Sequence, residues 1–183
     1  MRNLYLLRGI PGCGKSTFLS KYKLDGFVIS SDAIRLMFCP PILDKNSGRY
    51  IINQKNDKKV WDFLHSLVTD RIEKGYTTIV DATHCSESSI SWYKNLCQNN
   101  HANLIVVEFN DYSDAWLEKI LEQNRNRQKE FAIVPDEVLR RMFDNAKNSK
   151  LGSWCKVISK EEFAEILENS VGKYWFSLTL III

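Results

Sequence analysis

A glycine-rich run near the N-terminus carries the residue types and spacing that bind phosphate. Residues 9–16 read GIPGCGKS and match the pattern GxxxxGK[ST] at every fixed position. In this pattern the glycines let backbone N–H groups turn inward around a β-phosphate, and the N-terminus of the following helix adds a favourable dipole. The run therefore predicts a binding loop for the triphosphate of ATP or a close relative.

Each residue of this loop has a predicted role. Lys15 is expected to reach the β- and γ-phosphates and to act in catalysis, Ser16 to ligate Mg²⁺, and Thr17 to contact the α-phosphate. The other residues expected to line the nucleotide are Gly9, Gly12, Cys13 and Gly14. A chance glycine turn is the alternative. The context disfavours it, because a buried-strand pattern precedes the loop and a helical pattern follows it.

Two charged residues follow the second apolar run, in the segment SSDAIR at 30–35. Asp32 and Arg35 are three residues apart, which places both side chains on one face of a helix. Ligands of parallel sheets bind beyond the carboxyl ends of the strands, where this segment is expected. The carboxylate can orient a hydroxyl proton and the guanidinium can hold a phosphate. The alternative is a helix-capping aspartate with a solvated arginine.

A third candidate, Asp81, ends the apolar strand predicted at 77–80. At that sheet edge it can organise Mg²⁺ and its waters or hold a basic residue of an acceptor site, and a strand-ending turn residue is the alternative. The nearby His84 is a lone loop histidine, which we interpret as polar filling rather than as a base.

Arg125 and Arg127 follow a predicted helix at 113–124 and precede an irregular, charged segment that runs to Val134. A mobile flap bearing arginines neutralises developing charge and excludes water in phosphotransferases. The alternative is that both cations satisfy the dipole at the end of a helix.

Other conspicuous residues are interpreted as structural. The basic pairs at 58–59 and 140–141 are predicted to be solvated helix faces rather than a nucleic-acid groove. The tryptophans at core-like helical positions are predicted to pack rather than to stack on bases: Trp61, Trp92 and Trp116.

Apolar runs alternate with amphipathic stretches along the chain, which predicts an α/β domain with a parallel sheet covered on both faces. The predicted strands are 4–7, 27–29, 77–80, 104–109 and 157–158. The predicted helices begin at about residue 15 and continue with 30–37, 57–74, 86–98, 113–124, 135–145 and 159–167. The stretch from Pro40 to Asn56 is predicted to be a loop. Gly75 is expected to be the C-cap of the helix at 57–74, and Ser159 with Glu162 forms a capping-box pattern.

Composition narrows the setting. The chain has 183 residues and a net charge of +3, so one domain at 1–170 is expected and a polyanion would have to bind a local patch. An odd number of cysteines, five, favours a reduced, cytoplasmic protein. The apolar end at 171–183 is too short for the ~20 residues of a membrane helix. It is predicted to be a final strand or tail, with no membrane as partner.

Taken together, the motifs resemble the kinase domain of phage and bacterial polynucleotide 5′-kinases, the end-healing enzymes of nucleic-acid repair. Four features match in order between Asn3 and Phe143. They are the loop GIPGCGKST, the segment SSDAIR, VDAT at 80–83, and the arginine-rich lid NRNR at 124–127 with VP and VLRRM after it.

The resemblance implies a P-loop NTPase three-layer fold with a five-stranded parallel sheet, and ATP- and Mg²⁺-dependent phosphorylation of a 5′-hydroxyl end of RNA or DNA. Asp32 is then the general base that orients the hydroxyl, and Arg35 contacts a phosphate of the acceptor strand. The residues implied to support the acceptor side are Asp81 and Thr83. Those implied to contact the donor phosphates are Arg127 and, with it, Arg125.

Two residues depart from the family pattern. His84 stands where the family usually has asparagine, so the contact that this asparagine makes with the acceptor is not expected in the same form. Gln123 stands where an earlier lid arginine is common, so fewer cations are expected to contact the donor phosphates. Two other functions stay open, namely a kinase of a small molecule or nucleotide sugar on the same core, and a nucleotide-dependent switch.

Overall fold

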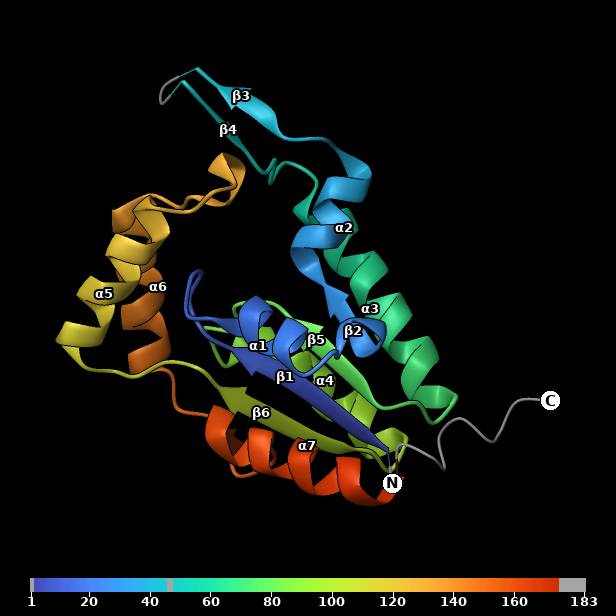
Figure 1. The fold of residues 1–183 in the computed structure, drawn as a ribbon. Helices are drawn as coiled ribbons and strands as arrows, with labels where there is room; N and C mark the ends of the chain where they lie inside the picture. The colour runs from blue at the N-terminus through green and yellow to red at the C-terminus, as the bar shows by residue number, and fades with distance from the viewer. Residues whose placement is uncertain (1, 46–47, 175–183) are drawn as a thin grey trace.

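A five-stranded sheet in the order β2-β5-β1-β6-β7 forms the centre of the computed structural model, which describes residues 2–45 and 48–174 (Figure 1). The strands are β1 (Asn3–Arg8), β2 (Val28–Ser30), β5 (Thr78–Asp81), β6 (Asn103–Glu108) and β7 (Lys156–Ser159). Every neighbouring pair is parallel. The prediction of an α/β fold with a five-stranded parallel sheet is confirmed.

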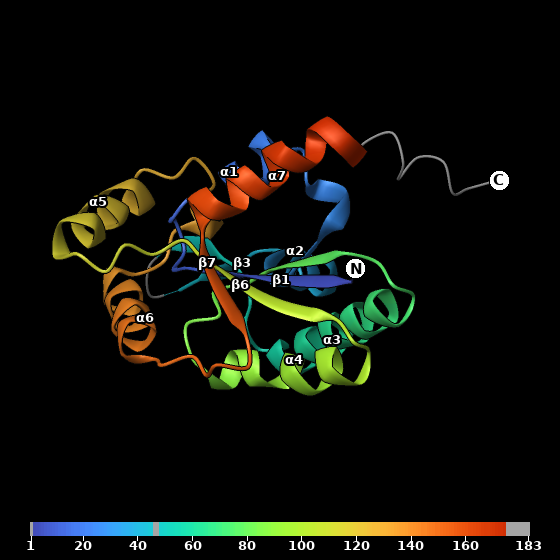
Figure 2. The same cartoon turned by 90° about the horizontal axis from the view of Figure 1, so that it is seen from below.

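Helices cover both faces of this sheet (Figure 2). One face carries α1 (Lys15–Lys21) and α7 (Lys160–Tyr174), and the other carries α3 (Asp57–Glu73) and α4 (Ser88–Asn99). The remaining helices are η1 (Asp25–Phe27), α2 (Ser31–Phe38), α5 (Asp114–Arg125), η2 (Glu130–Ala132) and α6 (Asp136–Asn148). The three layers of helix, sheet and helix match the fold class expected from the sequence.

The central strand β1 divides the interior into two apolar cores. Tyr5 and Leu7 belong to one cluster of buried residues, and Leu4 and Leu6 belong to the other. Successive side chains of a strand point to opposite faces, so a continuous apolar run is what a strand covered on both sides requires. This buried strand fixes the position of the loop that follows it.

Two local signals in the sequence have counterparts in the structure. The C-cap of α3 is Lys74, one residue before the predicted position, and Gly75 follows it with φ of 84°, a left-handed conformation that glycine adopts without strain. The Ser159 backbone N–H donates to Glu162 Oε2 at 2.7 Å, and the Glu162 N–H donates to Ser159 Oγ at 3.1 Å. This capping box begins α7.

Some predicted boundaries were wrong. Helix α7 extends to Tyr174, so the first residues of the apolar tail predicted at 171–183 are helical, and the rest of that tail lies outside the described residues. Pro135 is the N-cap of α6, with ψ of 140°, rather than part of its first turn.

The predicted loop before α3 contains a β-hairpin instead. Strands β3 (Ile42–Asp44) and β4 (Arg49–Ile51) pair antiparallel, with Leu43 opposite Tyr50 and Asp44 opposite Arg49. Three-residue strands are too short to show an alternating pattern, and their stability depends on a partner that the local sequence does not reveal. In this fold β4 also contacts η2.

The hairpin and the α5–α6 pair stand on different sides of the carboxyl ends of the strands (Figure 1). They therefore flank the edge of the sheet where parallel α/β folds bind their ligands. Within the described residues, no helix combines the length and the apolar content that crossing a membrane requires.

Candidate active site

The loop between β1 and α1 owes its path to three glycines. Gly12 and Gly14 have φ of 92° and 96°, a region that side chains rarely allow. At Gly9 the limit is space, because a Cβ there would lie 2.5 Å from Cys13 Sγ. The glycine pattern recognised in the sequence thus corresponds to a loop that other residues would distort.

Lys15 lies inside the curl of this loop. Its side chain is buried, and Nζ donates to the carbonyl oxygens of Gly9 at 2.7 Å and Ile10 at 3.3 Å. The first intrahelical bond of α1 runs from Phe18 N to Gly14 O, so the N–H groups of 14–17 precede it and are available to an anion. The loop therefore has the geometry of a phosphate cradle.

Two neighbouring strand ends hold the loop in place. The Gly9 N–H donates to Thr83 O at 3.0 Å, and the Ile10 N–H donates to Asn110 Oδ1 at 3.1 Å. Asn110 in turn donates to Glu108 Oε1 through its backbone N–H at 3.1 Å and its Nδ2 at 2.8 Å. These bonds join the loop to the segments that follow β5 and β6.

A buried arginine extends this network to α6. Arg8 donates from one terminal nitrogen to Glu108 Oε2 at 3.0 Å and from the other to the carbonyl of Ala146 at 2.6 Å. Arg8 and Glu108 are register partners in the sheet. Sequence reasoning missed the group Arg8, Glu108 and Asn110. The available signal was an arginine ending a buried strand, since a buried charge requires a partner.

Asp32 and Arg35 lie on α2 and form an ion pair at the mouth of the site. Arg35 donates to Asp32 Oδ1 at 2.8 Å through one terminal nitrogen and to Asp57 Oδ1 at 2.9 Å through Nε. Burial lowers the pKa of Arg35, but the two carboxylates outweigh that effect and raise it above its ordinary value. The expected pairing on one helix face is present, and Asp57, the first residue of α3, is a partner that sequence reasoning missed.

Asp81 ends β5 beside Leu7 of β1 and reaches the same edge. Burial raises the pKa of its carboxyl, the positive charge of Lys15 lowers it, and the charge of Asp32 raises it. Asp81 is therefore within electrostatic range of both Lys15 and Asp32. All three line one cavity, together with Ser16 and Thr83.

The segment between α5 and α6 is closed by a buried asparagine. Asn124 Nδ2 donates to Val134 O at 2.7 Å, and the Val134 N–H donates to Asn124 Oδ1 at 3.1 Å. These two hydrogen bonds join the first and last parts of the predicted lid. The lid is therefore a loop with a defined backbone position at both ends.

The two lid arginines have different environments. Arg127 donates to Ala132 O, and its guanidinium lies over the loop, since a Cβ on Gly12 would be 3.4 Å from one of its terminal nitrogens. Burial lowers the pKa of Arg127. Arg125 is exposed and pairs with Asp136, 3.0 Å from Nε to Oδ2. Arg127 thus lies directly at the glycine-rich loop, whereas Arg125 joins the lid to α6.

A cavity of about 1700 Å³ opens between these elements. Its described lining combines the glycine-rich loop, the ends of β2 and β5, the β3–β4 hairpin, the lid and α6. Nine lysine and arginine residues line it, against five aspartates and glutamates. A second cavity of about 530 Å³ shares Gly12, Gly14 and Thr17 with it and extends toward Phe18, Phe109 and Lys160.

Several residues lie apart from this site or only partly in it. His84 is buried, its Nδ1 is 2.8 Å from Leu7 O, and burial lowers its pKa to about 4. It is not among the residues that line the large cavity, and its Nε2 is a buried atom without a hydrogen-bond partner among the described residues. Trp61 packs against a core cluster but also lines the large cavity, and Trp116 packs against the other cluster. Trp92 is 39% exposed and stacks on His65.

The comparisons with known proteins agree with this architecture. Residues 4–149 match the family described as AAA domain. Kti12 of Chaetomium thermophilum, solved with ADP-AlF3, aligns over 92% of this chain and 97% of its own at 11% identity and a TM-score of 0.60. A gluconokinase from Sinorhizobium meliloti 1021 aligns over 94% and 92% at 15% identity and a TM-score of 0.51.

A chain of the Pnkp1/Rnl/Hen1 RNA repair complex aligns over 80% of this chain and 44% of its own length, at 18% identity and a TM-score of 0.62. At such identities the likeness shows the fold alone. The fold is shared by proteins whose names refer to RNA repair and to a sugar acid.

Proposed function

The chain belongs to the AAA domain family, and from this premise we propose that it transfers the γ-phosphate of ATP to a 5′-hydroxyl end of RNA or DNA. The observation that carries the proposal is the large basic cavity on the Asp32 side of the phosphate loop. Sites for drug-sized ligands measure roughly 300–1,000 Å³. A cavity of about 1700 Å³ with an excess of cations suits a polyanion better than a sugar.

The proposed position of the donor is supported by the two cavities that meet at the loop. In this proposal the phosphates bind along the N–H groups of 14–17 and Lys15, the nucleoside extends into the smaller cavity, and the γ-phosphate faces the larger one. This arrangement points the transferable group toward Asp32.

The residues present fit a magnesium ion held mainly by the donor. Within the described part of the chain, no group of three or more His, Cys, Asp or Glu could hold a metal by itself. Mg²⁺ commonly takes one or two protein oxygens together with substrate phosphates and water. Ser16 is the proposed ligand, with Asp81 beside it in the cavity, and the ion would neutralise charge on the phosphates.

The proposed reaction is a direct displacement. Asp32, with its side chain 67% exposed, accepts the proton of the acceptor hydroxyl. The hydroxyl oxygen bonds to the γ-phosphorus while the bond from that phosphorus to the bridging oxygen breaks, and ADP leaves with the electron pair. Lys15 and Arg127 stabilise the charge that develops on the transferred group.

The proposed role of Arg35 adds a second task to the phosphate contact that the resemblance implied. Its contacts with Asp32 and Asp57 already occupy Nε and one terminal nitrogen. We assign it to orienting the Asp32 carboxylate, and its second terminal nitrogen to the first phosphate of the acceptor.

The test is transfer of labelled γ-phosphate from ATP to a ten-nucleotide 5′-OH RNA or DNA, with gluconate and nucleosides as competing acceptors. We expect label at the 5′ end. Asp32→Asn should lower the rate by about 10²–10⁴-fold with ATP binding retained, since it removes the general base. Asp25→Asn, an exposed carboxylate outside the cavity lining, is the matched control. Label only on a small acceptor, or full activity of Asp32→Asn, would contradict the proposal.

A further inference from the structure

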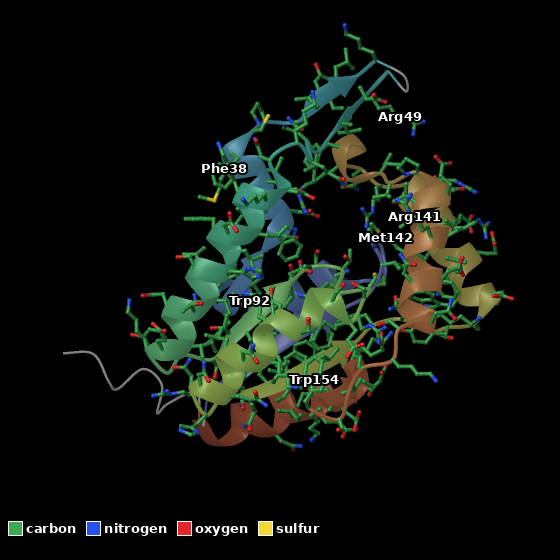
Figure 3. All side chains as sticks on the ribbon, turned by 180° about the vertical axis from the view of Figure 1, so that it is seen from behind. Phe38, Arg49, Trp92, Arg141, Met142 and Trp154 are labelled. Atoms are coloured by element: carbon green, nitrogen blue, oxygen red, sulfur yellow. The ribbon has the colours of Figure 1, made fainter. Side chains whose placement is uncertain are left out.

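The basic pair at 140–141 is divided by the fold. Arg140 leaves the cavity and forms an exposed ion pair with Glu118 of α5, 2.8 Å between the charged atoms. Arg141 lines the large cavity, and its side chain points from α6 toward the space below the hairpin (Figure 3). Both arginines are exposed, as predicted for a solvated helix face, but Arg141 faces the cavity and Arg140 does not. One helical step, about 100°, separates the two environments.

A second arginine lines the cavity from the other wall. Arg49 belongs to β4 and comes from the hairpin side in Figure 3. Asp44 is opposite Arg49 in the ladder. Among the side chains that the structure describes, however, no carboxylate lies within ion-pairing distance of Arg49 or Arg141.

Of the seven other lysines and arginines that line the cavity, four have polar partners. Lys15 and Arg127 donate to backbone carbonyls, Arg35 to two carboxylates, and Arg125 to Asp136. Among the described side chains, Lys45, Lys55 and Lys129 form no ion pair, but an ammonium lacks the planar, two-pronged donor group of arginine. The positive charge of Arg49 and Arg141 is thus less compensated than that of the cations nearer the reacting groups. An arginine that lines a cleft and has no carboxylate partner binds phosphate strongly, because its planar guanidinium group donates two parallel hydrogen bonds.

Apolar side chains lie among these cations. The described lining includes Ile42, Ile51, Val138 and Met142. Met142 follows Arg141 on α6, and Figure 3 shows both at the same wall. Alternating cations and apolar surface suit a nucleotide, whose phosphate is charged and whose base is flat and weakly polar.

We propose that Arg141 and Arg49 form a second phosphate subsite, which binds an internal backbone phosphate of the acceptor strand. This inference rests on the proposed function and specifies its substrate: a strand of several nucleotides rather than a nucleoside or mononucleotide. The subsite contributes to acceptor affinity and not to the chemical step, because Asp32 and Lys15 belong to other walls of the cavity.

The experiment compares Arg141→Ala and Arg49→Ala with Arg140→Ala on acceptors of different length. We expect Arg141→Ala to lower kcat/KM for a ten-nucleotide 5′-OH strand about tenfold through KM, as loss of one charged hydrogen-bonding group implies. The value for a nucleoside 3′-phosphate should not change. Arg140→Ala should match the wild type on both acceptors, and Arg49→Ala should follow Arg141→Ala.

Binding without transfer separates the subsite from the proposed function. Fluorescence anisotropy with a 5′-phosphorylated ten-nucleotide strand should show weaker binding for Arg141→Ala, with the salt slope of log K reduced by about 0.7. Equal binding by Arg141→Ala and Arg140→Ala, or an equal loss on short and long acceptors, overturns the subsite. If the wild type binds the strand but transfers phosphate to no 5′-hydroxyl, the proposed function is contradicted, while weaker binding by Arg141→Ala than by Arg140→Ala still supports the subsite.

Discussion

The proposed donor loop (residues 9–17) and the proposed acceptor wall (the part of the cavity lined by Asp32 and Arg35) hold their charged groups in different ways. Lys15 is buried and bonded within its own loop, six residues from its partner Gly9. Asp32 is largely exposed, and its partner Arg35 also depends on Asp57, which belongs to another helix. Local sequence therefore specifies the donor side, whereas the acceptor side depends on how separate elements pack.

The same contrast applies to stability. The pair Arg8–Glu108 is nearly buried and connects the sheet to α6, while the pair Lys74–Asp70 is exposed within one helix. Breaking a buried pair leaves an uncompensated charge, but an exposed pair exchanges its partner for water. The support of the donor loop is thus expected to be rigid, and the acceptor wall adaptable.

The largest expected effect is at the donor loop. Lys15→Met should reduce phosphate transfer by about 10³-fold, because it removes a cation that stabilises the transferred group. A transfer assay measures the rate, and isothermal titration measures the affinity for ATP. Lys119→Met changes an exposed lysine of α5 outside the cavity lining and should leave both unchanged. Normal transfer by Lys15→Met would remove the basis of the comparison.

The next effect is on folding. Glu108→Gln should lower the free energy of unfolding by about 3 kcal/mol, since Arg8 remains buried without its carboxylate. Urea denaturation followed by tryptophan fluorescence measures it. Lys74→Met should cost less than ~1 kcal/mol. An equal loss of unfolding free energy in the two variants would mean that the buried Arg8–Glu108 pair stabilises the protein no more than the exposed Lys74–Asp70 pair does.

The smallest of these three effects is expected at Asp57, which acts on the acceptor wall only by holding Arg35. Asp57→Asn should lower kcat/KM for a 5′-OH strand about tenfold, because the loss of one charge-assisted bond lets Arg35 move. The Kd for ATP should stay the same. The control Asp62→Asn alters an exposed residue of the same helix outside the cavity lining. A change in ATP affinity for Asp57→Asn would show that the two sides of the site are not separate.

Much of the fold was predictable because its signals are local. The apolar run of β1, the glycine after α3 and the capping box of α7 each reflect neighbouring residues in the chain. The β3–β4 hairpin was not predictable, because each strand is short and its partner is the other strand. The network of Arg8, Glu108 and Asn110 was missed for the same reason, since it joins residues about a hundred positions apart.

The sequence by itself determined the donor loop, since the conformations of its glycines and the reach of its lysine depend on nine consecutive residues. It also placed Asp32 and Arg35 on one helical face. Only the tertiary structure decided that Arg141 lines the cavity while Arg140 does not, and that Asp57 holds Arg35. The physical reason is that the packing of helices and strands decides where a side chain points and whether it is buried, and the local sequence does not contain that packing.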